Sequence, residues 1–196
     1  MIYILTALVA LAGSCVQSSS GFGYAIICMA IWPMFMPFYT ASILEAIAAF
    51  FMVIYIAVKL WKFIDWKLLL PPVIMATVTS LLGVNTLMAL DEAVLSKIMG
   101  TVLLVLAVYF IFFSSKVHLK AGLVSGLAAG AVSGFLIHVF QGHVSGAMLP
   151  LVGAALAGTA VGTAVGMFLF RRLTMTGIKK VVYIFMMCAG SYLLLS

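Results

Sequence analysis

Charged residues divide the chain into long apolar runs. They gather in residues 59–67, 91–97, 116–120 and 171–180, and the runs between them are roughly 20 residues long. A helix of about 20 apolar residues crosses the hydrocarbon core of a bilayer, which is about 30 Å thick. The pattern therefore predicts membrane-spanning helices over residues 40–60, 68–90, 94–113, 121–141, 146–170 and 178–195.

The first 38 residues need a different arrangement. As one helix, residues 2–38 would extend about 55 Å at roughly 1.5 Å per residue, far more than one crossing. The middle of this segment, residues 14–23, is small, polar and poor in helix-forming residues. Two helical halves of about 13 and about 15 residues fit better, so we expect a broken or re-entrant helix. Irregular backbone at membrane depth is tolerated only where protein buries it or it lines a cavity, so this break is the best site candidate.

Composition places the chain in the all-α membrane class. Of its 196 residues, 66% are hydrophobic and 7% are charged, against about half and about a quarter in soluble domains. Water cannot solvate so apolar a surface, which excludes a cytosolic enzyme, a nucleic-acid binder and a disordered protein. We expect one polytopic helix bundle of about seven membrane segments, forming a single domain over residues 1–196 with the lipid bilayer as its solvent.

Loop charge predicts the orientation. The segments at 59–67, 116–120 and 171–180 are basic, 91–97 is mainly acidic, and 141–146 has no formal charge. The positive-inside rule then places the basic segments in the cytoplasm and the C-terminus outside the cell (plasma or inner) membrane. The N-terminus stays open, because a re-entrant first segment would place it outside and a single crossing would place it inside. The net charge of +6 is thus explained by topology, without an anionic macromolecule as partner.

Two parts of the chain echo each other. Ser20-Gly21-Phe22 recurs as Ser133-Gly134-Phe135, and polar turns precede both Pro72 and Pro150. The order of the matches predicts two unequal repeats, about 1–115 and about 116–196, of which the second is shorter by roughly one helix. Repeats that meet at the bilayer midplane are typical of secondary transporters.

This ordered set of motifs resembles the sulfite exporter TauE/SafE family of 4-toluene sulfonate uptake permeases. The resemblance covers nearly all of residues 10–195, and the positions that carry it are Ser20-Gly21-Phe22-Gly23, Pro33, Pro37, Ala41, Asp65, Pro71-Pro72, Gly83, Asp91, Leu95, Gly100, the glycines from Gly122, and Arg171-Arg172-Leu173. It implies a polytopic permease that moves sulfite, sulfonates or other small organosulfur anions. Family members usually carry a second Gly-Gly-Pro-type break after the sequence matching Ser133-Gly134-Phe135, followed by a further helix. Here the chain continues directly into the next helix.

The break is the predicted anion site. Serine is a preferred N-cap, so its serines could simply cap a half-helix beginning near residue 22. The functional interpretation uses the same atoms, because free glycine N–H groups, serine hydroxyls and the helix dipole all favour an anion. The glutamine there could add a donor or satisfy freed carbonyls. The predicted substrate-binding residues are Gln17, Ser18, Ser19, Ser20, Gly21, Phe22 and Gly23.

Glycine recurs every four residues in two predicted helices. This spacing puts a flat stripe on one helix face and lets two backbones approach closely. The stripes lack polar atoms for ligand contact, so we interpret them as packing surfaces. Their members are Gly122, Gly126, Gly130 and Gly134 in one helix and Gly158, Gly162 and Gly166 in the other.

Glu45 is an acid inside a predicted span, which is by default a functional hypothesis, here a proton-coupling site. Its position near the outer interface equally allows a solvated, structural role. The histidines and cysteines lack metal-ligand spacing, so we expect no metal and no cofactor. No P-loop, HExxH or GxSxG motif is present, so we do not expect an enzyme.

The leading hypothesis is secondary transport of a small sulfur-containing oxyanion. The alternative is a non-transporting or partner-dependent membrane subunit, a relic of such a permease, because one site element is missing from the second repeat. A homodimer would let a shortened permease rebuild a complete path, and the size of the protein in detergent would distinguish the two.

Overall fold

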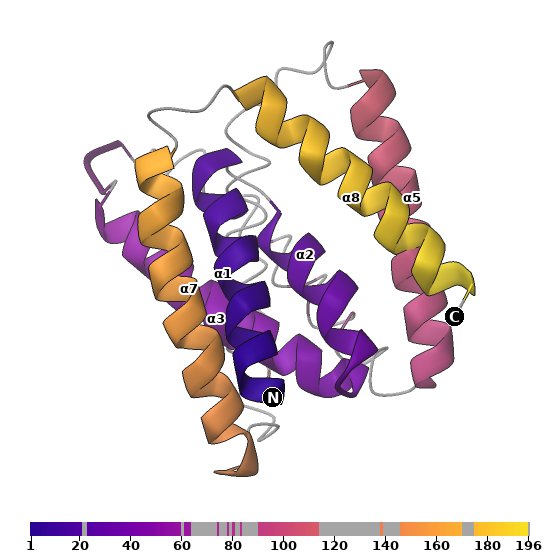
Figure 1. Cartoon of the computed structure of the whole chain (residues 1–196), viewed down its shortest axis with the longest axis horizontal. Coiled ribbons are helices and arrows are strands. Elements are labelled where there is room, and N and C mark those ends of the chain that lie inside the picture. The colour runs from indigo at the N-terminus through magenta and orange to yellow at the C-terminus, as the bar shows by residue number, and fades with distance from the viewer. Residues whose placement is uncertain are drawn as a thin grey trace.

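The computed structural model describes residues 1–20, 23–59, 61–63, 74, 78, 80, 83, 90–113, 138, 146–169 and 175–195. Within these residues the regular structure is helical, with no strand (Figure 1). The α-helices are α1 (Ile2–Ser20), α2 (Tyr24–Ile31), α3 (Phe38–Lys59), α5 (Glu92–Phe113), α7 (Leu149–Leu169) and α8 (Met175–Leu195), and the 3-10 helices are η1 (Trp32–Met34), η2 (Trp61–Phe63) and η3 (Gly146–Met148).

Four helical segments are long and apolar enough to cross a membrane, namely Ile2–Ser19, Phe38–Lys59, Glu92–Tyr109 and Gly146–Leu169. The prediction of an all-α, multi-pass membrane protein is therefore confirmed. The predicted spans at 68–90 and 121–141 lie almost entirely outside the described residues. The total of about seven segments and the two repeats accordingly stay predictions.

The predicted half-length first helix is wrong. Helix α1 continues without interruption for 19 residues, about 28 Å at roughly 1.5 Å per residue, which is enough for a full crossing. The hydroxyls of Ser14, Ser18 and Ser19 each donate to a carbonyl four residues earlier, at 2.7 Å. Serine lowers helix propensity in water, but in an apolar environment the helix itself satisfies both its backbone and its hydroxyls.

A break follows α1 at Gly23, whose φ of 119° and ψ of −12° are left-handed. Helix α2 then doubles back along α1. A Cβ added at Gly23 would contact Val16, and one at Gly13 would contact Tyr24 and Cys28, so the two helices run antiparallel. The break is thus real, but it lies at the end of a complete helix rather than in the middle of the segment. The first segment is thus a hairpin of α1 and α2.

Helix α7 packs parallel to α1, and the two lie side by side in Figure 1. Gly158 lies against Ala7, Gly162 against Leu11, and Gly166 against Cys15, so both helices advance by four residues in the same direction between contacts. The second predicted glycine stripe therefore faces α1 along its whole length. The first stripe, Gly122, Gly126, Gly130 and Gly134, lies outside the described residues.

Helices α5 and α8 form a second close pair, and here the helices are antiparallel. A Cβ on Gly100 would lie 2.9 Å from the carbonyl oxygen of Gly190, and a Cβ on Gly190 would lie 3.0 Å from the carbonyl oxygen of Gly100. Gly100 also faces Leu193, further along α8, whereas Gly190 faces Leu104, further along α5. This reciprocal contact was not predicted from the sequence.

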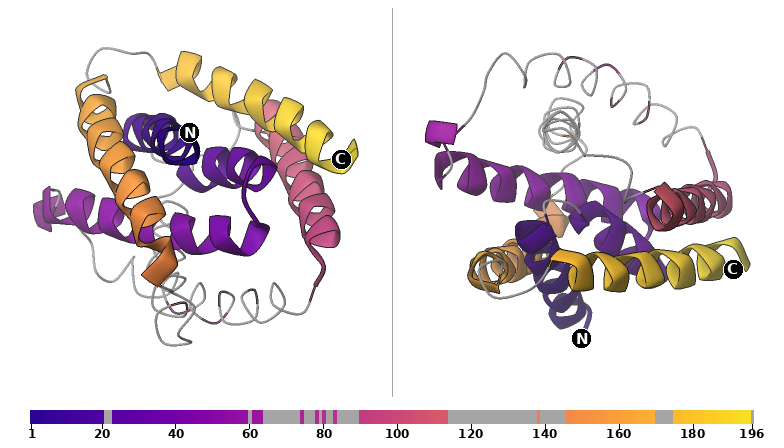
Figure 2. Two further views of the ribbon diagram at one scale, coloured as in Figure 1. Left: turned by 60° about the horizontal axis from the view of Figure 1, so that its bottom comes forward. Right: turned by 90° about the horizontal axis from the view of Figure 1, so that it is seen from above.

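The α1–α2 hairpin occupies the middle of the described bundle. It contacts α3, α5, α7 and α8, which enclose it in the left view of Figure 2. Because α1 and α7 are parallel, the N-terminus lies at the same end of the molecule as the start of α7 (Figure 1). The final turns of α3, α5 and α7, which lead into the three basic segments, lie at the opposite end.

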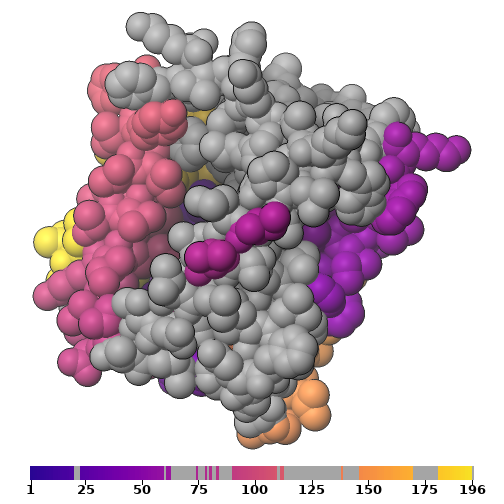
Figure 3. All heavy atoms as spheres, turned by 180° about the vertical axis from the view of Figure 1, so that it is seen from behind, coloured from indigo at the N-terminus to yellow at the C-terminus, as the bar shows by residue number. Residues whose placement is uncertain are grey.

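The outer faces of the helices are apolar. Seen from behind, α5 and α3 lie along opposite edges of the molecule (Figure 3). Side chains of this kind suit contact with lipid tails rather than water. The exposed large apolar residues of these two helices include Val94, Ile98, Val102, Val105, Phe112, Phe51 and Val58.

Candidate functional site

Gln17 caps the helix that follows the break. Its side-chain Oε1 accepts a hydrogen bond from the Tyr24 amide, at 3.0 Å, and so satisfies the first N–H of α2. The residue at the N-cap position is Gly23, and it makes no side-chain cap bond. The two roles considered for Gln17 both used its N–H groups, whereas the structure shows its carbonyl oxygen accepting an amide, which leaves the nitrogen of the same carboxamide as a donor.

Ser18 and Ser19 do not cap α2. Their hydroxyl protons are used inside α1, in bonds to the carbonyls of Ser14 and Cys15. Ser19 is 3% exposed, whereas Ser18 is half-buried. In this conformation neither hydroxyl has a proton left to donate to an anion. The Ser20 side chain, Gly21 and Phe22 lie outside the described residues.

The backbone conformation at Gly23 requires glycine. At a φ of 119° an L side chain is strained, and an added Cβ would also come to 3.0 Å from the Val16 Cγ1. Valine at this position would therefore disturb the fold before it affected a ligand. Loss of transport on substituting Gly23 cannot be assigned to close approach of an anion.

The break lies level with the C-terminal end of α7. Gly166 contacts Cys15 and Ser18, and α7 ends three residues later at Leu169. In sequence, Arg171 and Arg172 follow directly. The sequence contains no basic residue between Met1 and Val58, but the fold places the end of α7, which precedes a basic segment in the sequence, beside the break.

A buried polar contact joins α2 to α7 below the break. The Tyr24 hydroxyl and the Thr159 Oγ1 are 3.0 Å apart, and the two residues are 1% and 3% exposed. Thr163, one turn further along, donates to the Thr159 carbonyl at 2.7 Å. The sequence analysis missed these threonines. The signal was the repeated Gly-Thr pair in the stripe, at 158–159 and 162–163, which places a hydroxyl beside two of the three packing glycines.

Glu45 lies on the inner face of α3. Its neighbours at spacings of four and three residues, Ala41, Ala48 and Ala49, are all buried. Glu45 itself is half-buried and lies within electrostatic range of Tyr24 and Cys28 on α2. Glu45 therefore faces the α1–α2 hairpin rather than lipid.

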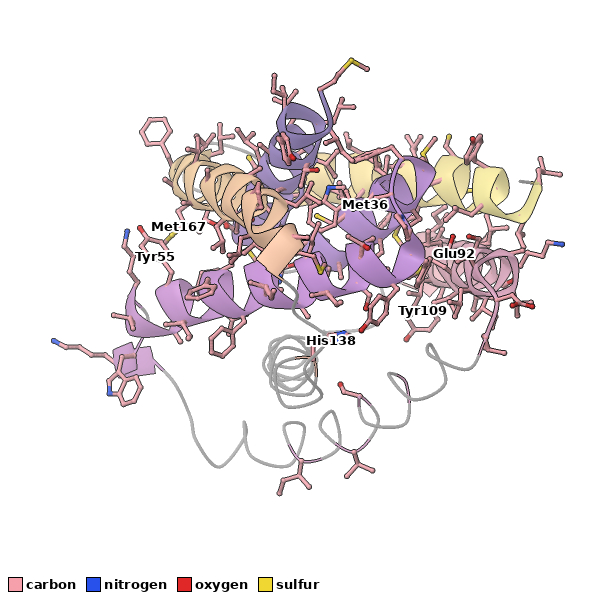
Figure 4. The ribbon with its side chains drawn as sticks, turned by 90° about the horizontal axis from the view of Figure 1, so that it is seen from below. Met36, Tyr55, Glu92, Tyr109, His138 and Met167 are labelled. Carbon is pink, nitrogen blue, oxygen red and sulfur yellow. The ribbon has the colours of Figure 1, made fainter. Side chains whose placement is uncertain are left out.

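His138 lies against the first turns of α3 (Figure 4). Its Nε2 is 3.5 Å from the Ser42 hydroxyl, and its ring meets that of Tyr39 edge to face at 6.3 Å. The side chain is 1% exposed. Among the described residues, no group of three potential metal ligands comes together. His138 is thus a buried, packed histidine, and its partner Ser42 lies one helical turn before Glu45 on α3.

Comparison with known families agrees with the geometry. The profile of the family described as Sulfite exporter TauE/SafE matches residues 5–137. The chain belongs to this family. The TauE/SafE family is one of membrane transporters for sulfite and related sulfur anions, and the matched residues contain most of α1 and all of α2, α3 and α5. No curated protein and no solved structure matches the chain.

Proposed function

We propose that this TauE/SafE protein is a secondary transporter that carries a small sulfur-containing oxyanion, such as sulfite or a sulfonate, across the cell membrane. The anion would bind at the α1–α2 break, in the segment from Gln17 to Gly23. The observation that supports this proposal most is the break itself, where the left-handed Gly23 precedes a new helix whose first amide Gln17 caps. The other amides in the first turn of a helix have no partner within the helix, and together with the helix dipole they favour an anion.

The position of the break favours an anion that enters from the cytoplasm. If the basic segments face the cytoplasm, the end of α7 does too, and so does the break beside it. The N-terminus then lies outside, together with the start of α7. Arg171 and Arg172 follow Leu169 in the sequence, so we expect positive charge near the mouth of the site. An electropositive α2 N-terminus would add to this attraction.

Glu45 would couple transport to protons. It is the acid on the inner face of α3, and it faces α2 rather than lipid. Glu45→Gln should abolish transport driven by a pH gradient while leaving exchange of labelled for unlabelled anion intact, because exchange needs no net proton movement. Glu92→Gln, at an exposed acid in the first turn of α5, is the matched control and should change neither. Equal gradient-driven uptake by the Glu45→Gln and parental proteins would exclude Glu45 from coupling.

Flux in a defined membrane tests the function. Purified protein reconstituted into liposomes should take up radiolabelled sulfite with saturation, and unlabelled sulfonates should compete. Protein-free liposomes and competition by chloride serve as controls. Protein that is folded by size exclusion yet moves neither sulfite nor any sulfonate faster than protein-free liposomes would refute transport.

A partner-dependent subunit remains the second candidate, because the family profile ends at residue 137 and both α7 and α8 lie beyond it. In that case the isolated chain would be inactive and would gain flux only with another subunit. If the partner is a second copy of this chain, the active form is a homodimer and no other protein is needed. Its mass in detergent, measured by light scattering with subtraction of bound detergent, should be twice that of the 20.9 kDa chain.

A further inference from the structure

Trp32 carries a buried donor without a hydrogen-bond acceptor among the described residues. It begins η1, at the end of α2, and its side chain is 0% exposed. Its Nε1 has no hydrogen-bond partner in the part of the chain that the structure describes. Buried indole N–H groups usually find a partner, because an unpaired donor keeps the full cost of leaving water.

The described surroundings of Trp32 are apolar. The side chain packs in an apolar cluster that joins α1, α2 and α3 and includes Met29, Met36, Leu44 and Ala48. The Tyr24 ring meets the Trp32 ring edge to face, with 6.5 Å between the ring centroids and an interplanar angle of 87°. The Tyr24 hydroxyl is already paired with Thr159.

Tyr24 connects Trp32 to the break. Its amide is held by Gln17, its hydroxyl by Thr159, and its ring touches the Trp32 ring. Tyr24 therefore contacts both Gln17, which caps α2 at the break, and the Trp32 ring further into the bundle. Glu45, which lies within electrostatic range of Tyr24, faces the same interior.

We propose that the Trp32 N–H binds an oxygen of the transported anion, at a second station deeper in the bundle than the break. This proposal rests on the proposed function. An indole nitrogen only donates, so its ligand must present an acceptor, and the oxygens of sulfite or a sulfonate are strong acceptors. The apolar surroundings strengthen such a bond and give the carbon portion of a sulfonate a compatible surface.

Fluorescence gives a test that does not depend on transport. The chain has three tryptophans, and Trp61→Phe with Trp66→Phe leaves Trp32 as the sole indole emitter. Titration with sulfite and, separately, with methanesulfonate should shift the Trp32 emission to longer wavelength with saturation, at half-effect concentrations close to the KM for transport. Protein with Trp32→Phe, which retains Trp61 and Trp66, is the matched control and should show no saturable shift.

Removal of the donor should weaken binding. Trp32→Phe, or replacement of Trp32 by β-(3-benzothienyl)alanine, which keeps the bicyclic ring and lacks the N–H, should raise KM roughly tenfold. The sulfur analogue preserves the volume of the side chain, so it decides the matter if the phenylalanine variant folds poorly.

An emission spectrum that no anion changes would overturn the proposal and assign the N–H to water or to no partner. An unchanged KM in the sulfur analogue would overturn it as well. Transport that stays intact with an unresponsive Trp32 would reject this station alone. A saturable shift in protein that moves no anion would reject the transport function and retain the binding site.

Discussion

Two pairs of helices approach each other through glycine, and they differ in what else they bring to the contact. In the α1–α7 pair all the facing glycines come from α7, and the helices run parallel. In the α5–α8 pair each helix contributes one glycine, and the helices run antiparallel. Both arrangements depend on van der Waals contact between backbones, since lipid offers no hydrophobic drive between helices.

The chemical content of the two pairs is not the same. Beside the α7 glycines lie Thr159 and Thr163, together with the Tyr24 hydroxyl, and the first pair ends at the break held by Gln17. The cluster around the second pair is apolar apart from Tyr183. Close glycine contact therefore identifies packing, and the functional region is the pair that adds buried polar atoms and irregular backbone. Damage to the first pair should affect both fold and transport, and damage to the second should affect fold alone.

The largest effect is expected for Gly162→Leu. An added side chain would overlap the Ser14 hydroxyl and the Leu11 backbone, and the backbone cannot move without shifting α1. The cost of such overpacking should exceed about 3 kcal/mol. We expect loss of the sharp size-exclusion peak and of sulfite flux. Gly153→Leu, on the same helix but with open space around its Cβ, should retain both. A normal peak for Gly162→Leu would mean that α7 does not pack on α1 as described.

Two substitutions of Gln17 should distinguish its structural role at the break from the effect of charge on anion binding. Gln17→Leu leaves the buried Tyr24 amide without an acceptor and should lower stability by about 1–3 kcal/mol, measured as a lower melting temperature. Gln17→Glu keeps an acceptor, so its melting temperature should stay near the parental value. The added negative charge should nevertheless repel the anion and raise KM at least about tenfold. If Gln17→Glu transports with the parental KM, the anion does not approach this residue.

The smallest effects are expected in the second pair. Gly100→Ala and Gly190→Ala each meet contacts of 2.9–3.2 Å, which smaller shifts can relieve, so each should cost about 1–2 kcal/mol. The double variant should cost less than the sum, because one separation of the helices relieves both contacts. Flux per folded molecule should not change. A raised KM in either single variant would contradict the assignment of this pair to packing.

Much of the fold could be predicted because apolar length and charged punctuation report directly on membrane crossing. The predicted spans at 40–60 and 94–113 differ from α3 and α5 by two residues or fewer at each end. The length of α1 could not be read in this way. Serine counts against helix in water, whereas Ser14, Ser18 and Ser19 satisfy their hydroxyls within the helix when water is absent.

The break at the candidate site was predictable in kind but not in detail. Glycine and serine marked the irregular segment, yet the capping role of Gln17 depends on α2 folding back onto α1. The Gly100–Gly190 contact joins residues that share no periodic pattern, so it could not be predicted from the local sequence. Loop charge left the side of the N-terminus open. The parallel packing of α1 and α7 places the N-terminus at the same end of the molecule as the start of α7.

The central claim is that the anion binds at the α1–α2 break, on the side of the basic segments. The most direct measurement uses Ser18→Cys in a protein whose native thiols Cys15, Cys28 and Cys188 are replaced by alanine. Its rate of labelling by an impermeant thiol reagent is compared in inside-out and right-side-out vesicles, with and without methanesulfonate. A sulfonate is the better ligand here, because sulfite itself consumes thiol reagents. Lys62→Cys, in exposed η2 at the first basic segment, is the matched control.

The account predicts that both cysteines react only in inside-out vesicles and that methanesulfonate slows labelling at residue 18 alone, with half-protection near its KM. Labelling of the Ser18→Cys protein from the outside would contradict the orientation. A labelling rate that no transported sulfonate changes would contradict the binding site.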